Sequence, residues 1–316
     1  MQEDWPTRFS REAFERVDAF IADHPEYTRE GVEQPGQGST NRVVFARRDG
    51  ELVVFKVFCE EERKQRECFA SRHWSDTGLV PQLIWDNDPW MMIMAHIPGY
   101  FPGSIRDSAR EVWLDSCREV GKASATLICV PLSAAAREEF EARFYEFGPL
   151  EAYLQRILEL GRGVQARDPD FRDDFWRVSL DFIEEQLPSI FSEPRCLYHQ
   201  DAGNLHVADG KFMGFFDLEM CRVGCHAMQL ASSALSEADA WIRFREGWES
   251  VIGQQLTAEQ LRAACAGQHL LDWREITRYM SYDGTPGTGF SWADPADPVR
   301  YRSGIEVVNR TLGVIM

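Results

Sequence analysis

The chain has 316 residues, of which 44% are hydrophobic, so it can form a substantial core and wholesale disorder is excluded. Its formal net charge of −17 argues against a nucleic-acid backbone or an anionic membrane surface as the main partner. A cationic small molecule is compatible with this charge. No segment approaches the ~20 apolar residues of a membrane span, and the N-terminus has no apolar signal-peptide region.

The first hundred residues are rich in strand signals. An amphipathic helix over 10–22 precedes two β-rich runs that flank an Asp49-Gly50 turn, which is a strong hairpin signal. A charged helix and two further apolar strands follow, and Pro98-Gly99 then breaks the chain. The predicted ranges are 42–47 and 52–58 for the hairpin, 60–77 for the helix, and 80–85 and 90–94 for the strands.

The remainder of the chain reads mainly as helix. Helical patterns cover 109–130, 134–160, 170–191 and most of 227–280, and one β-rich island lies at 196–217. The segment 283–298 reads as loop. The sequence therefore predicts an α+β, bilobal architecture. A small β-rich N-terminal lobe would span 1–97, and a larger, mainly helical C-terminal lobe would span 98–316.

Eight cysteines are scattered along the chain without a paired CxxC motif. We expect them to be reduced and mostly buried, as in a cytoplasmic protein. Cys221, Cys225 and His226 are close together in the sequence, but a fourth ligand is not evident, which disfavours a zinc site.

The small lobe carries residues suited to binding phosphate groups. A loop containing Gly36 and Gly38 precedes the hairpin, and glycines let backbone N–H groups approach phosphate oxygens closely. Lys56 lies within a predicted strand, and Glu67 on the next helix is its natural partner, with Glu62 as second choice. Alternatively, the glycine loop is an ordinary turn, and Lys56 extends its ammonium group to solvent.

The large lobe carries acidic and amide side chains around one predicted hairpin. Asp201 and Asn204 precede this hairpin, and Asp217 and Glu219 follow its last strand. A single aspartate here would more often belong to a turn or a helix cap. Four such residues around one hairpin instead favour metal and nucleotide chemistry, because phosphoryl transfer needs oriented carboxylate and amide oxygens.

These motifs resemble the aminoglycoside phosphotransferase and choline kinase-like family, which has the protein-kinase-like fold. The family pattern is His-x-Asp, then Asn, a short hairpin and Asp-x-Glu. The corresponding residues are His199-Gln200-Asp201, Asn204 and Asp217-Leu218-Glu219, together with Gly38-Ser39-Thr40-Asn41, Lys56, Glu67 and Ile97-Pro98-Gly99. The resemblance covers residues 36–231.

The resemblance implies a role for each matched residue. Asp201 would be the catalytic base, and Asn204 and Asp217 would ligate Mg²⁺. ATP or GTP would be the nucleotide. The residues implied to bind it are Gly38, Ser39, Asn41, Lys56 and Glu67, with main-chain groups around Met94 and His96 holding the purine.

Three positions depart from the family pattern. The loop from Asp201 to Asn204 is two residues shorter, and an alignment without a gap would place His199 at the position of the base. Gln229 stands where the family usually has an aspartate that braces the catalytic loop, and Ala95 stands where the hinge often has glutamate. The gapped alignment keeps Asp201 as the base. Because the loop is short, the alternative remains that the chain is a kinase-like nucleotide-binding protein with little or no catalytic activity.

The expected activity is transfer of the γ-phosphate to a hydroxyl of a small molecule. An aminoglycoside-like or amino-alcohol acceptor comes first because the chain is acidic, and a sugar or other natural product comes next. Nucleic acid and membrane are not expected as partners. Protein or peptide phosphorylation is disfavoured, because no long activation segment follows Glu219. Aromatic and acidic residues near the C-terminus could bind such an acceptor or belong to the core: Trp241, Trp248, Trp273, Trp292, Asp272, Glu275, Asp283 and Asp294.

Overall fold

The computed structural model describes residues 5–29, 41–145, 148–233, 237–279 and 298–314. The backbone divides into two compact units. The first comprises Met1–Gly99 and Met213–Met220, and the second comprises Tyr100–Phe212 and Cys221–Met316. The first unit thus includes residues 213–220, which are distant in the sequence from the rest of it.

The first unit contains a five-stranded sheet in the order β1-β2-β3-β5-β4. The described strand pairs are all antiparallel, and the predicted hairpin is present because Asp49 and Gly50 both adopt positive φ between its strands. The elements are α1 (Trp5–Asp23), β1 (Tyr27–Thr28), β2 (Arg42–Arg48), β3 (Glu51–Val57), α2 (Glu61–His73), η1 (Ser75–Thr77), β4 (Leu83–Trp85) and β5 (Met91–Ala95).

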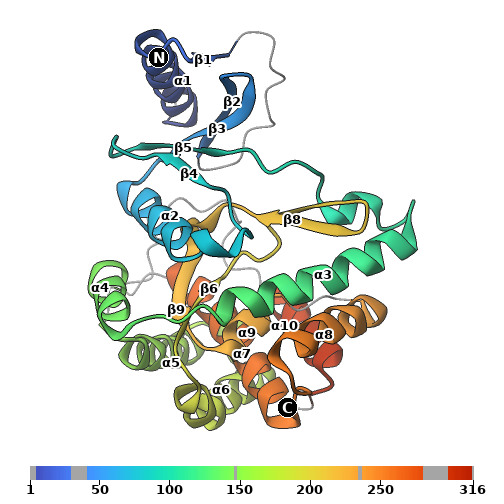
Figure 1. Cartoon of the computed structure of the whole chain (residues 1–316). Coiled ribbons are helices and arrows are strands. Elements are labelled where there is room, and N and C mark those ends of the chain that lie inside the picture. Colours follow the sequence, from blue (N-terminus) through green and yellow to red (C-terminus); the bar gives the residue numbers. More distant parts are fainter. Residues whose placement is uncertain (1–4, 30–40, 146–147, 234–236, 280–297, 315–316) are drawn as a thin grey trace. The chain divides into compact units, whose positions relative to one another are not determined.

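Both faces of this sheet are covered by a helix (Figure 1). Val53, Phe55 and Val57 alternate along β3 and pack in a core with Val17 of α1. The opposite face contributes a second cluster, in which Met92 and other side chains pack near α2. The end of β3 from Phe55 to Val57 is therefore buried on both sides, which explains why the strand after Glu51 is an apolar run interrupted only by a lysine.

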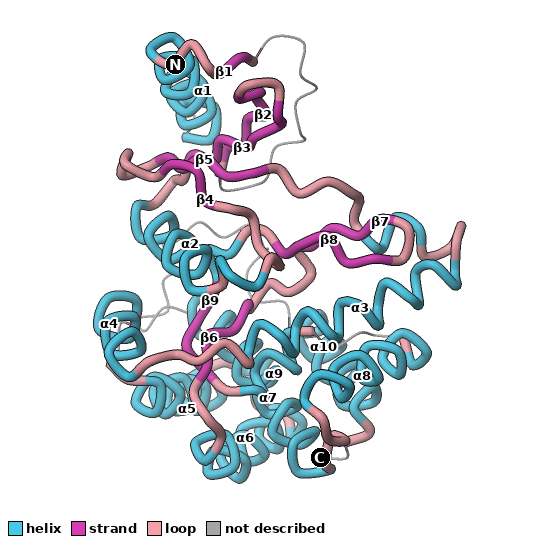
Figure 2. The backbone as a smooth tube through the Cα atoms, in the orientation of Figure 1, coloured by secondary structure: helices cyan, strands magenta, loops and turns pink. Residues whose placement is uncertain are grey.

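The second unit is mostly helical, as the cyan segments of Figure 2 show. Its described helices are η2 (Pro102–Ile105), α3 (Arg110–Ile128), α4 (Ala134–Phe144), α5 (Leu150–Arg167), η3 (Pro169–Phe171), α6 (Asp174–Ser192), α7 (His226–Ser232), α8 (Ala238–Ile252), α9 (Ala258–Tyr279) and α10 (Pro298–Leu312). None of the described helices is long and apolar enough to cross a membrane.

Two details differ from the sequence prediction. The single helix expected over 134–160 is two helices, because Gly148 has φ +86° and Pro149 caps the start of α5. Helix α10 was not predicted. The loop expected at 283–298 lies almost wholly outside the described residues.

Two small sheets contain the predicted β-rich island. Strand β6 (Cys196–His199) pairs with β9 (Cys221–Gly224), and β7 (Leu205–Ala208) pairs with β8 (Lys211–Phe215). A turn at Asp209-Gly210, with positive φ at both residues, joins β7 to β8. Phe216 and Asp217 follow β8, and η4 (Leu218–Met220) begins after them. Asp217 and Glu219 therefore belong to the first unit, whereas Asp201 and Asn204 belong to the second.

Helices α3 and α8 lie side by side and meet at two glycines (Figure 1). A Cβ on Gly121 would lie 2.0 Å from the carbonyl oxygen of Phe244, and a Cβ on Gly247 would lie 2.0 Å from that of Arg118. Each helix thus brings its backbone against a glycine of the other. This close approach requires the absence of a side chain at both positions.

Candidate active site

Lys56 is the centre of a buried charge cluster in the first unit. It lies within β3, where it faces Val43 of β2 and Met92 of β5 in the sheet register. Its side chain is almost wholly buried, and its Nζ lies 2.6 Å from Glu67 Oε2. Burial lowers the pKa of Lys56, but the neighbouring carboxylates outweigh burial and raise it above its ordinary value. The ammonium therefore stays charged.

Glu67, rather than Glu62, is the α2 carboxylate beside Lys56. Glu62 pairs instead with Arg66 on its own helix. Burial raises the pKa of Glu67 to about 7, and the lysine charge opposes this shift. The other two carboxylates near Lys56, those of Asp217 and Glu219, also raise the Glu67 pKa.

Asp217 reaches Lys56 from the end of β8. One of its carboxylate oxygens accepts a hydrogen bond from Lys56 Nζ, and its side chain is 37% exposed. Its backbone has φ +59°, a left-handed conformation that aspartate and asparagine tolerate better than most residues. The N–H of Phe215 donates to the carbonyl of Leu79 at 2.8 Å, which fixes the end of β8 within the first unit. Asp217 is therefore the partly accessible carboxylate of the cluster.

Glu219 connects α2 to the segment before β2. Its carboxylate accepts hydrogen bonds from Arg63 at 2.9 Å and from the side-chain amide of Asn41, and it lies 3.7 Å from Lys56 Nζ. Arg66 donates to its main-chain carbonyl at 3.2 Å. Arg63 and Arg66 were not predicted from the sequence, because arginines on a highly charged helix resemble solvent-exposed residues. Their spacing, three positions apart on one helix face, was the available signal.

The oxygen atoms in this cluster suit a hard cation. One carboxylate oxygen from each of Glu67, Asp217 and Glu219 lies within 4.8 Å of the others. Oxygen ligands are those that Mg²⁺ prefers, and the partial exposure of Asp217 gives access. Within the described part of the chain, Cys221, Cys225 and His226 do not form a comparable group.

Asp201 and Asn204 lie in a tight turn of the second unit. Asp201 is exposed, whereas His199, the last residue of β6, is completely buried. The N–H of Asn204 donates to the Asp201 carbonyl at 2.9 Å, and the N–H of Leu205 donates to the Gly203 carbonyl at 3.0 Å. Exposure makes the Asp201 carboxylate available to a substrate, which the buried imidazole of His199 is not.

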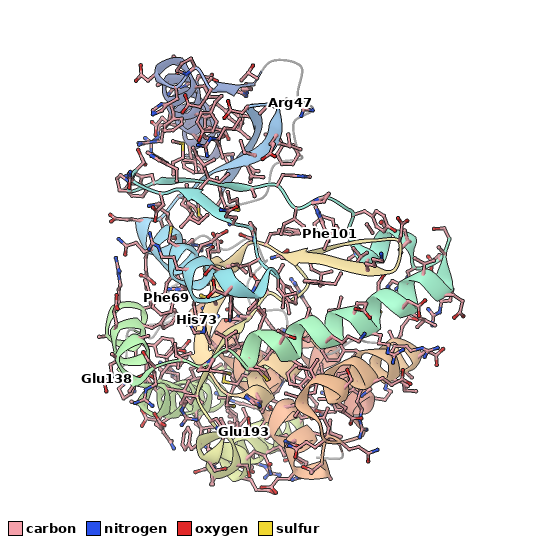
Figure 3. All side chains as sticks on the ribbon, viewed as in Figure 1. Arg47, Phe69, His73, Phe101, Glu138 and Glu193 are labelled. Atoms are coloured by element: carbon pink, nitrogen blue, oxygen red, sulfur yellow. The ribbon has the colours of Figure 1, made fainter. Side chains whose placement is uncertain are left out.

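The strand that leads into this turn is held by Gln229 of α7. Its side-chain oxygen accepts from the His199 N–H at 2.8 Å, and its amide donates to the His199 carbonyl at 3.4 Å. Glu193, labelled in Figure 3, accepts from the N–H of Ala227 at 3.0 Å and so caps the first turn of α7. Gln229 thus braces this strand with an uncharged side chain.

The remaining predicted residues are placed as follows. The N–H of Ala95 donates to Gln82 O at 2.9 Å and that of His96 to Leu52 O at 3.3 Å, so both take part in hydrogen bonds within the first unit. Met94 is buried and pairs with Val54. Gly38, Ser39, Thr40, Trp292, Asp283 and Asp294 lie outside the described residues. Trp241, Trp248 and Trp273 are buried in the core.

Solved structures share this fold. A choline/ethanolamine kinase family protein from Mesorhizobium loti superposes with a TM-score of 0.62 at 18% identity, covering 95% of this chain and 94% of that one. The ADP-bound aminoglycoside phosphotransferase APH(2'')-Ib gives 0.62 at 13% identity, with coverage of 96% and 99%. Macrolide 2'-phosphotransferase MphH from Brachybacterium faecium gives 0.61 at 16% identity, with coverage of 94% and 98%. These likenesses confirm the predicted α+β, protein-kinase-like fold.

The sequence itself matches the family model described as "Phosphotransferase enzyme family" over residues 31–274. No curated protein sequence matches the chain. The family model covers most of the chain. The matched range includes the Lys56 cluster, the Asp201 turn and the β7–β8 hairpin that follows this turn. This chain therefore belongs to the phosphotransferase enzyme family.

Proposed function

We propose that the protein transfers the γ-phosphate of ATP or GTP to a hydroxyl group of a small molecule. The observation that carries this proposal is the buried Lys56, held by Glu67 and Asp217 within the first unit. A fixed ammonium can pair with nucleotide phosphates. Phosphoryl transfer depends mainly on such positioning and charge neutralisation.

Each predicted site residue has a task in this reaction. Lys56 would contact the phosphates while Glu67 holds it in place, and Asn41, Gly38, Ser39, Met94 and His96 would contribute to nucleotide binding. Asn204 and Asp217 would hold Mg²⁺, which when bound neutralises charge on the phosphates. Asp201 would orient the acceptor hydroxyl and accept its proton. Its exposure in the turn supports this assignment over His199.

The acceptor we propose is a cationic small molecule of the aminoglycoside or amino-alcohol type. The net charge of −17 favours such a molecule, and a sugar or another natural product is the next choice. Solved structures of the same fold include a choline/ethanolamine kinase family protein and a gentamicin complex of APH(2'')-IIa. The eight cysteines are all free thiols, which supports a cytoplasmic location.

Replacement of Asp217 tests the reaction. Consumption of MgATP and MgGTP would be screened against aminoglycosides, amino alcohols and sugars, with wild type and Asp217→Asn compared. Asparagine tolerates the left-handed backbone of this position, so the variant removes charge with little strain. We expect a kcat loss of at least about 10²-fold, as for other charge-stabilising groups. Asp209→Asn is the matched control, because Asp209 also has positive φ (+50°) but lies in the β7–β8 turn.

A second candidate function is nucleotide binding without efficient transfer. The observation that favours it is the Asp201–Asn204 loop, which is two residues shorter than the family pattern. Thermal stabilisation by MgATP or MgGTP, with no phosphate transfer to any screened acceptor, would support this function. Normal turnover by Asp217→Asn would instead contradict the metal role of that residue.

A further inference from the structure

We propose that Arg222 and Gln200 form a clamp that positions the Asp201 turn for catalysis. This inference rests on the proposed function of Asp201 as the group that orients the acceptor hydroxyl. Gln200 immediately precedes Asp201, and Arg222 Nε donates a hydrogen bond to Gln200 Oε1 at 2.8 Å. Arg222 is a positioning residue in this proposal because it acts through Gln200.

The clamp is built on the sheet of β6 and β9. Tyr198 and Arg222 are directly opposite each other in the antiparallel register, so their side chains share one face. From this face the guanidinium reaches Gln200, which lies beyond the end of β6. A side chain on a fully buried strand thereby determines where the exposed turn begins.

The surroundings of Arg222 are aromatic. Its guanidinium carbon lies 5.9 Å from the ring centroid of Tyr145 and 5.7 Å from that of Tyr153, and these two rings stack at 4.8 Å. The Tyr145 hydroxyl donates to the carbonyl of Val223, which fixes the first ring against β9. The rings confine the guanidinium by packing and by cation–π attraction.

Arg222 is a buried charge, with only 6% of the residue exposed. Among the residues that the structure describes, no carboxylate forms an ion pair with it, although the charge of Glu275 helps to raise the pKa of Arg222. Burial of a charge without such a pair is costly for folding. Among the described side chains, the one that accepts a hydrogen bond from Arg222 is that of Gln200, the residue beside Asp201.

Two successive residues before Asp201 are therefore anchored. Gln229 holds the main chain of His199, and Arg222 holds the side chain of Gln200. Asp201 itself is exposed, and its loop is shorter than in the family. Anchoring of this kind fixes the path of a short turn. Displacement of the catalytic carboxylate by about 1 Å can lower the reaction rate roughly 10²-fold.

The test uses Gln200→Leu, which removes the acceptor at a half-buried site while Arg222 stays charged and packed against its aromatic neighbours. We expect kcat for MgATP turnover to fall by roughly 10- to 100-fold with KM for MgATP unchanged. Gln200→Glu keeps an acceptor for Arg222 and should retain most of kcat. Gln254→Leu, at an exposed position of the second unit, is the matched control. Wild-type kcat in Gln200→Leu would overturn the clamp.

The pair is tested by a double-mutant cycle with Arg222→Met. If the two residues act through one hydrogen bond, Gln200→Leu/Arg222→Met loses no more kcat than the worse single variant. Losses that multiply would overturn the coupling. Each variant would first be checked for a wild-type melting transition. If Arg222→Met does not fold, the clamp is tested by comparing kcat of Gln200→Leu with kcat of Gln200→Glu.

Hydrogen exchange separates failure of the clamp from failure of the proposed function. The N–H groups of Asn204 and Leu205 are bonded within the turn, so their exchange reports its order without any activity. We expect faster exchange of both in Gln200→Leu. If the wild type transfers no phosphate, the proposed function fails, and the clamp is judged by exchange alone. Unchanged exchange in Gln200→Leu would overturn it.

Discussion

Gln229 bonds both polar groups of the His199 main chain. It accepts from the N–H at 2.8 Å and donates to the carbonyl at 3.4 Å. The aspartate that the family usually has at this position could accept from an N–H group but, when ionised, could not donate. An amide is thus suited to this completely buried place, and the missing negative charge does not leave the strand unsupported.

Gln229→Leu removes these two hydrogen bonds and a third, from the amide of Gln229 to the Ser233 hydroxyl at 3.0 Å, while keeping the volume of the side chain similar. We expect the free energy of unfolding to fall by about 2 kcal/mol, because buried hydrogen bonds are lost without replacement by water. Urea denaturation at neutral pH measures the change. Gln155→Leu, at an exposed position of α5, serves as the control. A loss below about 0.5 kcal/mol, typical of surface substitutions, would contradict the bracing role.

Gly121→Ala should separate α3 from α8. Its new Cβ would overlap the carbonyl oxygen of Phe244, which is backbone and cannot rotate away. We expect a loss of about 3 kcal/mol in the free energy of unfolding, at the upper end of the usual range for overpacking. Gly304→Ala is the control in α10, where nothing lies within 4 Å, and it should stabilise by about 0.5–1 kcal/mol. Equal stability of the two variants would refute the close crossing.

His269 should make stability depend on pH. The imidazole is completely buried. It accepts a hydrogen bond from the Ser179 hydroxyl at 3.0 Å and donates one to the Asn309 side chain at 3.0 Å. The Trp273 indole also donates to the Ser179 hydroxyl, at 3.2 Å. Burial lowers the pKa of His269 to about 4. The unfolded chain binds this proton near pH 6.5 and the folded chain does not. Stability therefore falls as pH decreases from about 6.5 toward 4.

The measurement compares wild type with His269→Gln at pH 7 and pH 5. Wild type should lose about 2 kcal/mol more than the variant over this interval, since each pH unit within the window costs up to about 1.4 kcal/mol. Burial also lowers the pKa values of His73 and His226. The difference between the two proteins isolates His269, and parallel pH profiles would show that it does not contribute.

Glu219→Ala tests the carboxylate that joins α2 to the Lys56 cluster. The variant leaves Arg63 and Asn41 without their shared acceptor in a buried site. We expect the free energy of unfolding to fall by about 3 kcal/mol, as when one partner of a buried ion pair is removed. Glu12→Ala, which removes a long and exposed pair with Arg8, should change stability by less than about 0.5 kcal/mol. Equal effects of the two substitutions would contradict a structural role for Glu219.

Much of the first unit could be predicted from local sequence. The Asp49-Gly50 turn between two β-rich runs fixes the hairpin, and the alternation along β3 fixes which side chains face α1. Lys56 stood out because a charge within an apolar strand needs a partner, and Glu67 was the natural choice on the following helix. These features depend on neighbours within about a dozen residues.

Long-range features could not be predicted in the same way. In the sequence, Arg63 and Arg66 resemble surface residues. Their bonds to Glu219, which lies in a distant segment, are known only from the folded structure. Arg222 gave no signal, because its meaning depends on the pairing of β9 with β6. The break in the helix expected over 134–160 had a local signal, Gly148-Pro149, which helical periodicity on either side obscured.

The grouping of 213–220 with the first unit has a consequence for biosynthesis. Asp217 follows Lys56 by 161 residues, so a ribosome completes most of the chain before the lysine can meet this carboxylate. Until then Lys56 and Arg63 lack their carboxylate partners from the later segment, and Arg66 lacks the main-chain carbonyl of Glu219. A nascent or truncated chain that ends before residue 213 therefore keeps the pair of Lys56 with Glu67 but lacks the carboxylates of Asp217 and Glu219. The Lys56 cluster gains its full set of partners only late in translation.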